Sequence, residues 1–490
     1  MDITFIILSS TFAVLLFTYI FYFYYLKPYS YFDKINIPGP KPKFIVGNLW
    51  DTVYARRHLC LTDHVKKYGK IFGLYYGRKP IIHVADPDIA YEILVKQSEN
   101  FINRIKFGPT SKQPVGLIDA RDVTWKHARE SLTPLFSPNK LKAMSHFANE
   151  ASSNLLEKVL HKIDNDDDTV NVRELFYSTA MDMSLSSLFG VKPNEEKKIE
   201  LQTHINNFLG GIRRPISVLF FALPNIYRFL SLFIAYKQVK GIIKASSMLR
   251  EIVTARRREL DQGLSTRTDM LKLVIEAEHK EKISDFDIVQ HCFTFLIGGY
   301  DTTASNLTFI AFALATNPDV QDKVIEEIDQ YCPDEDNLNY NDIQKLDYLE
   351  MTINEAFRYF SAGYISLREA KSDCVINGVQ FPKGVGIAIA VKAIHEDPDI
   401  WENPDKFDPQ RFSADQKSKR HPCHFLPFSD GPRKCIGNRL GIMNLKLILV
   451  RLLQQVKFEV ANQTENPLPT VVVFTAIPEN PVILKIVRRT

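Results

Sequence analysis

The longest apolar run in the chain lies at its N-terminal end. From Ile3 to Leu26 the sequence holds 24 residues without a charged side chain. A helix of that length reaches about 36 Å, enough to cross a hydrocarbon layer of about 30 Å. A cleaved signal peptide is the alternative, but its apolar region is usually only about 7–15 residues long, and no small-residue cleavage pattern follows this run. The pattern favours an uncleaved transmembrane helix over residues 3–26.

The charges around this run predict its orientation. Only Met1 and Asp2 precede it, whereas a group of basic residues follows it: Lys27, Lys34, Lys41, Lys43, Arg56 and Arg57. Because positive flanks stay on the cytosolic side of a membrane, we expect the rest of the chain to be cytosolic. Residues 27–43 include three prolines between positions 37 and 42, which block a helix. They predict a stiff hinge that leads into a cytosolic domain over residues 44–490.

Beyond the hinge, apolar positions recur mainly with the period of an α-helix. Long helical patterns fill the region from about residue 125 to residue 360, and they outnumber the strand-like stretches. Those stretches are residues 70–76 with 80–84, and residues 374–381 around an Asn377-Gly378 turn. We find neither an internal repeat nor a long linker, so we expect one large domain, mainly α with a minor β-sheet. Length alone, at 490 residues, would suggest about three domains.

A second apolar stretch runs from Ile216 to Tyr236 and is interrupted by Pro224 and Arg228. A membrane-spanning helix would place Arg228 near the centre of the bilayer at a cost of about 2.5–3.5 kcal/mol. The pattern favours two short amphipathic helices that dip into the membrane surface. Core packing and a second membrane span are the alternatives.

Composition narrows the possible classes of function. The 61 basic residues exceed the 57 acidic ones by only four, giving a formal net charge of +4, so nucleic acid is not expected to be the main partner. Six cysteines are too few for a disulfide-stapled secreted scaffold, and no two of them form a C-x-x-C pair. Zinc-ribbon and ferredoxin spacings are therefore absent, which leaves a single thiolate ligand as the remaining possibility.

Cys435 stands in the most distinctive loop of the sequence. A tight turn is expected at Gly431-Pro432, and Gly437 would let the backbone approach something flat. A helical pattern follows up to about Leu453, so Cys435 is predicted to lie at a helix start. There the free amide groups, together with Arg433 and Lys434, should lower the pKa of the thiol. Such a thiolate can ligate haem iron, although Cys435 taken alone is also compatible with a buried structural cysteine.

A long helix is predicted from Ser284 to Asn317. Ser284 with Asp287 forms a capping pattern, and Pro318 marks the end. Residues 298–303, Gly-Gly-Tyr-Asp-Thr-Thr, should weaken the helix in its middle. The functional interpretation is a groove over the iron, in which Thr302 hydrogen-bonds oxygen and Asp301 relays protons through water. The alternative is a threonine that bonds back to a carbonyl one turn earlier.

The pattern Phe428-x-x-Gly431-x-Arg433-x-Cys435-x-Gly437 resembles the haem-binding signature of the cytochrome P-450 monooxygenases. The resemblance covers nearly the whole chain and is closest to the animal microsomal branch that oxidises drugs and steroids. It implies the cytochrome P-450 fold, a single domain that encloses haem b, and Cys435 as the axial thiolate that binds the iron. Phe428 would pack against the haem or its ligand. Ser429 stands where the family usually has glycine.

Other parts of the sequence resemble further family elements. Glu355, Arg358 and Arg411 imply an internal cluster that locks the cysteine loop, although Ser361 replaces a usual proline and Gln410 a usual acid. The segment from Gly298 to Thr303 is similar to the oxygen-activation motif, which implies catalytic roles for Asp301 and Thr302. The resemblance also implies a group of residues that meet the haem propionates: Arg104, Trp125, Arg129, Arg368 and Arg433.

The function implied by the resemblance is that of a monooxygenase held in the endoplasmic reticulum membrane by one span. It would insert one atom of dioxygen into a small apolar substrate, using NADPH electrons delivered by NADPH–cytochrome P-450 reductase, with cytochrome b5 as a further donor. A basic docking face for the reductase is predicted from Lys126, Lys434, Arg439 and Lys446. The alternatives are a haem-thiolate isomerase or dehydratase on the same fold and a non-catalytic haem-binding membrane protein. Residues 104–122, 205–215 and 361–366 mark segments that would recognise the substrate without naming it.

Overall fold

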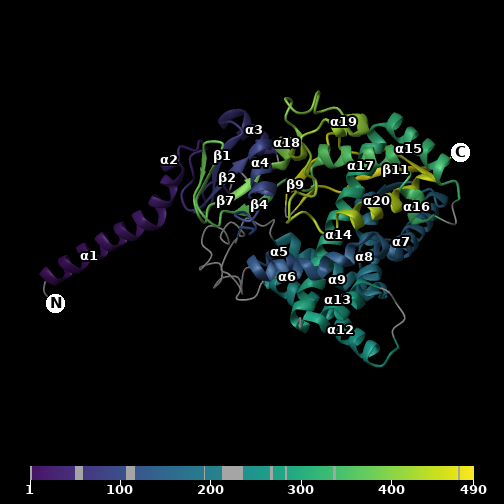
Figure 1. Cartoon of the computed structure of the whole chain (residues 1–490), viewed down its shortest axis with the longest axis horizontal. Helices are drawn as coiled ribbons and strands as arrows, with labels where there is room; N and C mark the ends of the chain where they lie inside the picture. The colour runs from purple at the N-terminus through teal and green to yellow at the C-terminus, as the bar shows by residue number, and fades with distance from the viewer. Residues whose placement is uncertain are drawn as a thin grey trace.

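The computed structural model describes residues 3–49, 59–105, 116–192, 194–211, 236–264, 269–281, 284–334, 338–472 and 475–489. Its first helix, α1 (Ile3–Phe21), continues into the π-helical turn η1 (Tyr22–Leu26) and points away from the body of the molecule (Figure 1). Its apolar side chains are largely exposed, with Leu8 at 70%. In these described ranges, no helix is long and apolar enough to cross a membrane. The transmembrane span predicted for residues 3–26 is therefore not confirmed.

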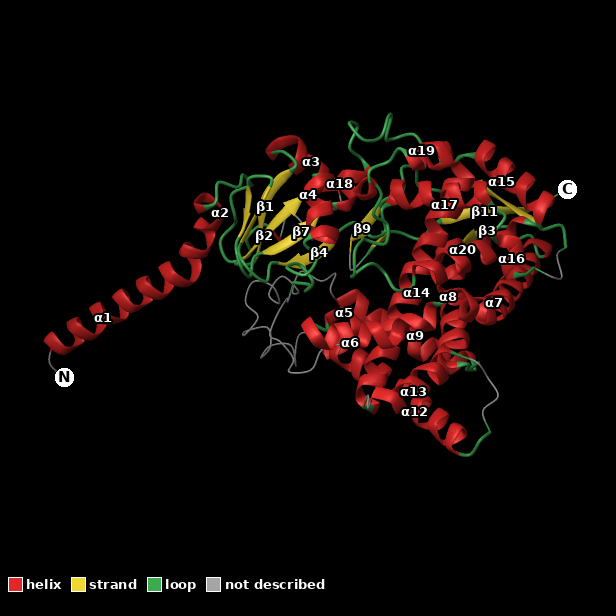
Figure 2. Ribbon diagram, viewed as in Figure 1, coloured by secondary structure: helices red, strands yellow, loops and turns green. Residues whose placement is uncertain are grey.

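Strands are a minor part of the fold, as predicted, and the largest sheet lies on the side of the body nearest α1 (Figure 2). Its order is β1-β2-β7-β4, in which β2 and β7 run parallel and the other neighbours antiparallel. These strands are β1 (Ile71–Tyr76), β2 (Lys79–Val84), β7 (Gly386–Ile389) and β4 (Ser366–Glu369). The first predicted strand pair, residues 70–76 with 80–84, is thus confirmed as the β1–β2 hairpin.

The remaining strands form small sheets. The second predicted hairpin is confirmed as β5 (Cys374–Ile376) and β6 (Val379–Phe381). Asn377 and Gly378 between them have φ angles of 49° and 81°, the positive values that a type I′ turn requires. The other two sheets comprise β3 (Thr169–Asn171), β11 (Ile483–Arg488) and β8 (Val456–Val460), and β9 (Thr470–Val472) with β10 (Ala476–Pro478).

Helices make up most of the body, which confirms the mainly α prediction. Those of ten or more residues besides α1 are α3 (Leu59–Tyr68), α6 (Asp122–Leu132), α7 (Pro138–Asp164), α8 (Val172–Phe189), α9 (Glu195–Gly211), α12 (Tyr236–Asp261), α13 (Met270–Glu281), α14 (Asp285–Thr316), α15 (Pro318–Tyr331), α17 (Asp347–Phe360) and α20 (Asn438–Leu453). Shorter ones are α2 (Tyr31–Lys34), α4 (Pro87–Tyr91), α5 (Gly116–Asp119), α16 (Tyr340–Ile343), α18 (Val391–His395) and α19 (Ala414–Ser418).

The long helix α14 runs through the centre of the main core. Ser284 caps it by accepting a hydrogen bond from the backbone of Asp287, whose carboxylate accepts one from Ser284 in return. Apolar side chains on several of its faces, such as Leu296, Leu307 and Phe309, are almost fully buried. Its observed bounds therefore confirm the helix predicted from Ser284 to Asn317.

The proline-rich segment packs on the large sheet. The carbonyl of Pro38 accepts a hydrogen bond from Gly73 at 2.8 Å, and a Cβ at Gly39 would come within 2.2 Å of the Gly73 carbonyl oxygen. Only glycine therefore fits at position 39. The division into an anchor (3–26), a hinge (27–43) and a domain (44–490) remains a prediction. For the apolar stretch Ile216–Tyr236, residues 216–235 lie outside the described ranges.

Candidate active site

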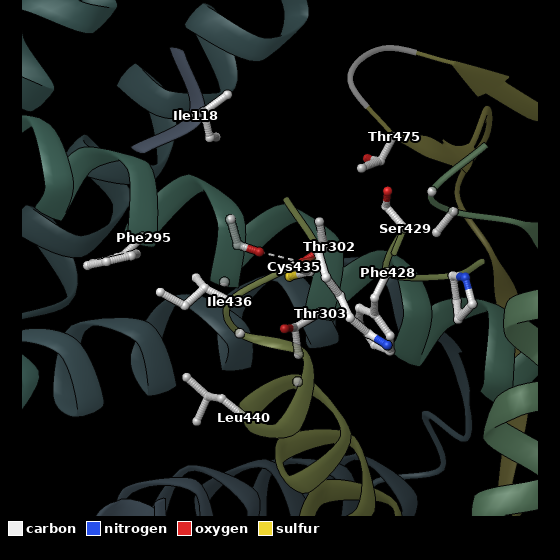
Figure 3. A pocket seen from close by; sticks show the side chains of 18 of the residues that line it. Ile118, Phe295, Thr302, Thr303, Phe428, Ser429, Cys435, Ile436, Leu440 and Thr475 are labelled. Atoms are coloured by element: carbon white, nitrogen blue, oxygen red, sulfur yellow. Dashed lines mark hydrogen bonds between the residues drawn. The ribbon is translucent and has the colours of Figure 1, made fainter. Parts of the chain in front are cut away.

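A cavity of about 500 Å³ lies between the middle of α14 and the loop that carries Cys435 (Figure 3). Trp125 and Arg129 of α6 line it, and so do residues of α8, of β4 and of the start of α20. Its apolar lining includes Phe136, Phe295 and Ile118. Segments that are far apart in the sequence therefore converge on Cys435.

The fold of the cysteine loop depends on a backbone that glycine permits. Gly431 has a φ of 71°, and a Cβ there would come within 1.7 Å of the carbonyl oxygen of Leu94. The turn closes when the amide of Cys435 donates a hydrogen bond to the carbonyl of Phe428 at 2.9 Å. Phe428 lines the cavity and packs edge-on against Phe357, with ring centroids 5.3 Å apart. The loop thereby presents Cys435 to the cavity.

The electrostatic environment of Cys435 differs from the prediction. α20 begins at Asn438, so the cysteine precedes the helix instead of starting it. Burial raises the pKa of the Cys435 thiol, while the amide of Gly437 and the charges of Arg104 and Arg129 lower it. The side chain is accessible to the cavity and at the same time surrounded by protein. The net direction of the pKa shift is therefore opposite to the predicted lowering, because desolvation outweighs the amide and the positive charges.

On the opposite wall, α14 continues as an α-helix through residues 298–303. Thr302 lines the cavity, and its hydroxyl donates to the carbonyl of Gly298 one turn earlier. The backbone carbonyl of Thr302 accepts from Asn306 at 2.8 Å. The segment that was expected to weaken the helix stays helical, and the Thr302 hydroxyl makes the bond to a carbonyl one turn earlier that was given as the alternative. Figure 3 shows Thr302 and Cys435 on different segments that border the same cavity.

Asp301 points away from the cavity and into a hydrogen-bonded network. Its carboxylate accepts from the hydroxyls of Tyr177 at 2.8 Å and Thr475 at 3.0 Å. Asp301 is buried at 7% exposure and does not line the cavity, whereas Thr475 does. Asp301 and Thr302 are thus neighbours in the sequence with different surroundings.

Arginine side chains make this region strongly electropositive. Arg104 and Arg129 line the cavity, and burial lowers the pKa of both. Arg433 stacks over Trp125 at 4.2 Å and donates to the carbonyls of Ile102, Leu117 and Ala120. Burial and neighbouring arginines lower the pKa of Arg433 to about 8. Much of its hydrogen-bonding capacity therefore fixes the backbone beside the cavity.

Arg368 lies next to the cavity wall, and its contact with a haem propionate remains a prediction. It does not line the cavity but is buried behind it, at 2% exposure. Its guanidinium donates to the hydroxyls of Ser366 at 3.1 Å and Ser429 at 3.2 Å, and both serines do line the cavity. The sequence placed Ser366 only in the substrate-recognition segment 361–366 and did not connect it with Arg368. The serine at the glycine position of the signature was the only signal for this arrangement.

The cluster predicted around Glu355 is confirmed. Arg358 pairs with Glu355 through two hydrogen bonds of 2.8 Å, both side chains are fully buried, and Arg411 lies 3.5 Å from the carboxylate. The cluster reaches the cysteine loop through a residue that sequence reasoning missed. Arg358 donates to the carbonyl of His395, whose Nε2 accepts from the amide of Leu426 at 2.9 Å.

The cavity fits the haem that the sequence resemblance implies. A Cβ at Gly298 on α14 or at Gly441 on α20 would meet no atom within 4 Å, so both walls leave room for a flat group. Cys435 offers sulfur as an iron ligand, and Arg104 and Arg129 offer positive charge to carboxylates. The donors and the shape agree with an iron porphyrin that bears two propionates.

Comparison with known proteins gives the same assignment. Residues 37–485 match the family model described as Cytochrome P450. The chain is 33% identical to cytochrome P450 3A28 of Bos taurus, over 99% of this chain and 96% of the relative. It is 34% identical to cytochrome P450 3A30 of Fundulus heteroclitus, over 99% and 98%. It is 32% identical to lithocholate 6-beta-hydroxylase of Mesocricetus auratus, over 96% and 94%.

The match covers nearly the whole chain, and family members bind haem b through a cysteine thiolate. An isomerase or dehydratase and a non-catalytic haem protein are not favoured. The chain belongs to the cytochrome P450 family and is a haem-thiolate monooxygenase.

Proposed function

We propose that Cys435 is the axial thiolate of haem b and that Arg104, Trp125, Arg129 and Arg433 face the propionate side. The observation that carries this proposal is that Cys435 and the arginines border one cavity opposite Thr302. When bound, the haem supplies the family's chemistry: substrate, dioxygen, two electrons and two protons give hydroxylated product and water. The protein's own residues bind the group, exclude water and place protons.

Thr302 and Asp301 have different roles in proton delivery. The Thr302 hydroxyl hydrogen is engaged by the Gly298 carbonyl, so its oxygen is available to accept a hydrogen bond within the cavity. Asp301 is linked to the cavity through Thr475, which donates to it. This arrangement supports Asp301 as a buried carboxyl group that orients hydroxyls and water at the cavity wall.

The substrate is proposed to be a rigid, mostly apolar molecule of the steroid class. Phe136, Phe295 and Ile118 provide an apolar surface, and one relative is named for the 6-beta-hydroxylation of lithocholate. A test compares lithocholate with linear fatty acids as ligands, measured by the spectral shift of the haem. Preference for the linear acids would contradict this assignment.

Electrons are proposed to come from NADPH through a flavoprotein reductase, with cytochrome b5 as a second donor. Lys126, Lys434 and Arg439 are exposed and support a docking face. Lys446 does not belong to it, because it is 1% exposed and bonded to Glu350 at 2.8 Å and to the carbonyls of Ile343 and Leu346. The prediction that included Lys446 is wrong.

We also propose that α1 holds the enzyme at the endoplasmic reticulum membrane. Exposed apolar side chains such as Leu8, Phe12 and Phe17 support membrane contact. Alkaline carbonate should leave the full chain in the membrane fraction if α1 inserts, whereas it should release a chain that lies on the surface. Full release of the chain by high salt alone would contradict both forms of attachment.

The central test is the reduced carbon monoxide difference spectrum of the full chain. A thiolate-type band is expected for the natural sequence and not for Cys435→Ser. Addition of the reductase should then give NADPH-dependent oxygen use. A natural protein without the thiolate band would refute the role of Cys435, and an intact band without oxygen turnover would refute monooxygenation with this donor.

A further inference from the structure

Arg368 carries a buried positive charge that the protein does not neutralise directly. In the described part of the chain, no carboxylate lies within ion-pairing distance of its guanidinium. Its guanidinium donates hydrogen bonds to Ser366, Ser429 and the carbonyl of Leu367. Burial, together with the charge of Arg104, lowers the pKa of Arg368 to about 9. A buried cation of this kind is stable only when an anion or strong acceptors compensate it.

The two serines that contact Arg368 also contact each other. Ser366 Oγ and Ser429 Oγ lie 2.8 Å apart, and we call these two residues the serine pair. Each serine hydroxyl carries one hydrogen. The guanidinium of Arg368 only donates hydrogen bonds, so it cannot accept either of these hydrogens. One hydroxyl hydrogen is used within the serine pair, so the other remains to be donated. Both serines line the cavity, and Figure 3 shows Ser429 beside Phe428 at its wall.

Ser429 has a backbone conformation that favours glycine, so the advantage of serine at this position lies in its hydroxyl. Its φ of 58° lies in the left-handed region, where glycine is favoured. A serine there opposes the local backbone preference and gains the bonds to Ser366 and Arg368. The serine pair is therefore a built arrangement: two side-chain hydrogen bonds join β4 to the cysteine loop, and a third links Arg368 to Ser366 within β4.

We propose that the serine pair transmits the positive charge of Arg368 to the cavity and donates its remaining hydroxyl hydrogen to a carboxylate of the bound haem. This inference rests on the proposed haem site. Arg368 acts through the serines, which are positioning residues for the cofactor, while Arg104 and Arg129 meet the cavity directly. A hydroxyl that accepts from a guanidinium is a stronger donor than a free one, because hydrogen bonds in a chain polarise one another.

A carboxylate is the ligand chemistry that fits. It accepts hydrogen bonds only, it is anionic, and its charge compensates the buried guanidinium. A steroid acid bound as substrate could supply the same group. The experiment must therefore separate retention of haem from binding of an acid ligand.

The test uses the haem-loaded full chain with Ser366→Ala, Ser429→Ala and the double variant. Transfer of haem to excess apomyoglobin should become about tenfold faster in each single variant, as expected for loss of a charge-assisted hydrogen bond. The midpoint potential of the iron should fall, because a carboxylate with fewer hydrogen bonds stabilises the ferric state. Ser366→Thr keeps a hydroxyl, so its rate of haem transfer and its midpoint potential should be close to those of the natural protein.

Ser152→Ala is the matched control, because Ser152 is a buried serine on α7 that is not part of the cavity lining. It should leave haem transfer and potential unchanged. Ser429→Gly removes the hydroxyl at a backbone conformation that glycine favours, so it provides a second variant with little risk of misfolding.

Unchanged haem transfer and potential in the double variant or in Ser429→Gly would overturn the proposal. It would also be overturned if haem transfer stayed normal and only lithocholate binding weakened, which would assign the serine pair to the substrate carboxylate. A natural protein without a thiolate band would instead refute the haem site itself. The two failures are therefore distinguishable.

Discussion

Two buried histidines show how hydrogen-bond partners decide the role of a residue. His395 Nε2 accepts from the amide of Leu426, so its Nδ1 carries the hydrogen and donates to Ser361 Oγ at 2.9 Å. Ser361 then donates to the carbonyl of Arg358 at 2.8 Å. This chain joins the end of α17 to the start of the cysteine loop. His83 on β2 is fully buried too, but neither ring nitrogen has a partner in the described structure.

His83 should make stability depend on pH. Burial lowers its pKa from 6.5 to about 3, so between these values the unfolded chain binds a proton that the folded chain does not. Stability is therefore fully present above pH 6.5 and falls as the pH decreases, by about 1.4 kcal/mol per unit. At pH 5 the loss should be about 2 kcal/mol relative to pH 7.

His83→Phe should remove this contribution while keeping the ring stack on Phe72, whose centroid lies 5.0 Å away. The measurement is the free energy of urea unfolding at pH 7 and pH 5 for both proteins. Equal losses on acidification in the natural protein and in the variant would show that His83 does not titrate as its burial requires.

Ser361 is the second residue whose surroundings predict a measurable effect. Its φ is 47°, and its amide donates to the carbonyl of Phe357 at 3.0 Å. Proline, which the family resemblance places here, requires a φ near −65° and has no amide hydrogen. Ser361→Pro should therefore cost about 3 kcal/mol or more, measured as a lower thermal midpoint. Ser361→Gly, which tolerates this φ, should cost only about 1 kcal/mol, and an unchanged midpoint in the proline variant would contradict the observed backbone.

At the scale of elements, α14 shows what the sequence predicts well and where prediction stops. Its ends were predictable because the capping box at Ser284 and Pro318 act locally. Its middle was harder to predict, because the sequence left open whether the Thr302 hydroxyl bonds back to the Gly298 carbonyl, as it does, or faces the cavity without that bond. The direction of Asp301 depends on Tyr177 and Thr475, which come from distant elements. Local patterns carry no information about such partners.

Thr302 on this helix should control how efficiently electrons reach the product. Thr302→Val has a similar shape but no hydroxyl, so it cannot accept a hydrogen bond in the cavity. We expect hydroxylated product per NADPH to fall by roughly 100-fold, with NADPH oxidation continuing and hydrogen peroxide accumulating. Thr302→Ser keeps the hydroxyl and should retain most of the coupling. Full coupling in the valine variant would exclude a role for this hydroxyl in proton delivery.

Across the whole molecule, the features that sequence reasoning missed are contacts between distant segments. Lys446 was expected at the surface, yet α20 buries it against the carbonyls that precede α17. Cys435 was found from its motif, but the sign of its pKa shift depends on burial by the surrounding fold. The serine pair joins residues 63 positions apart. Motifs thus located the site, whereas packing determined the electrostatics of its residues.

The proposed docking face without Lys446 leads to a prediction about the redox partner. Trp125 and Arg433 are in contact at 4.2 Å, and the residues that follow them in the sequence, Lys126 and Lys434, are both exposed. Lys434→Glu should raise the reductase concentration needed for half-maximal turnover by about tenfold at low salt, because it replaces attraction with repulsion. The effect should shrink as salt screens the charges. Lys244→Glu on α12 places the same charge change on an exposed site away from the cavity lining and should leave turnover unaltered. Equal reductase affinity and equal salt dependence in the natural protein and Lys434→Glu would place the docking face elsewhere.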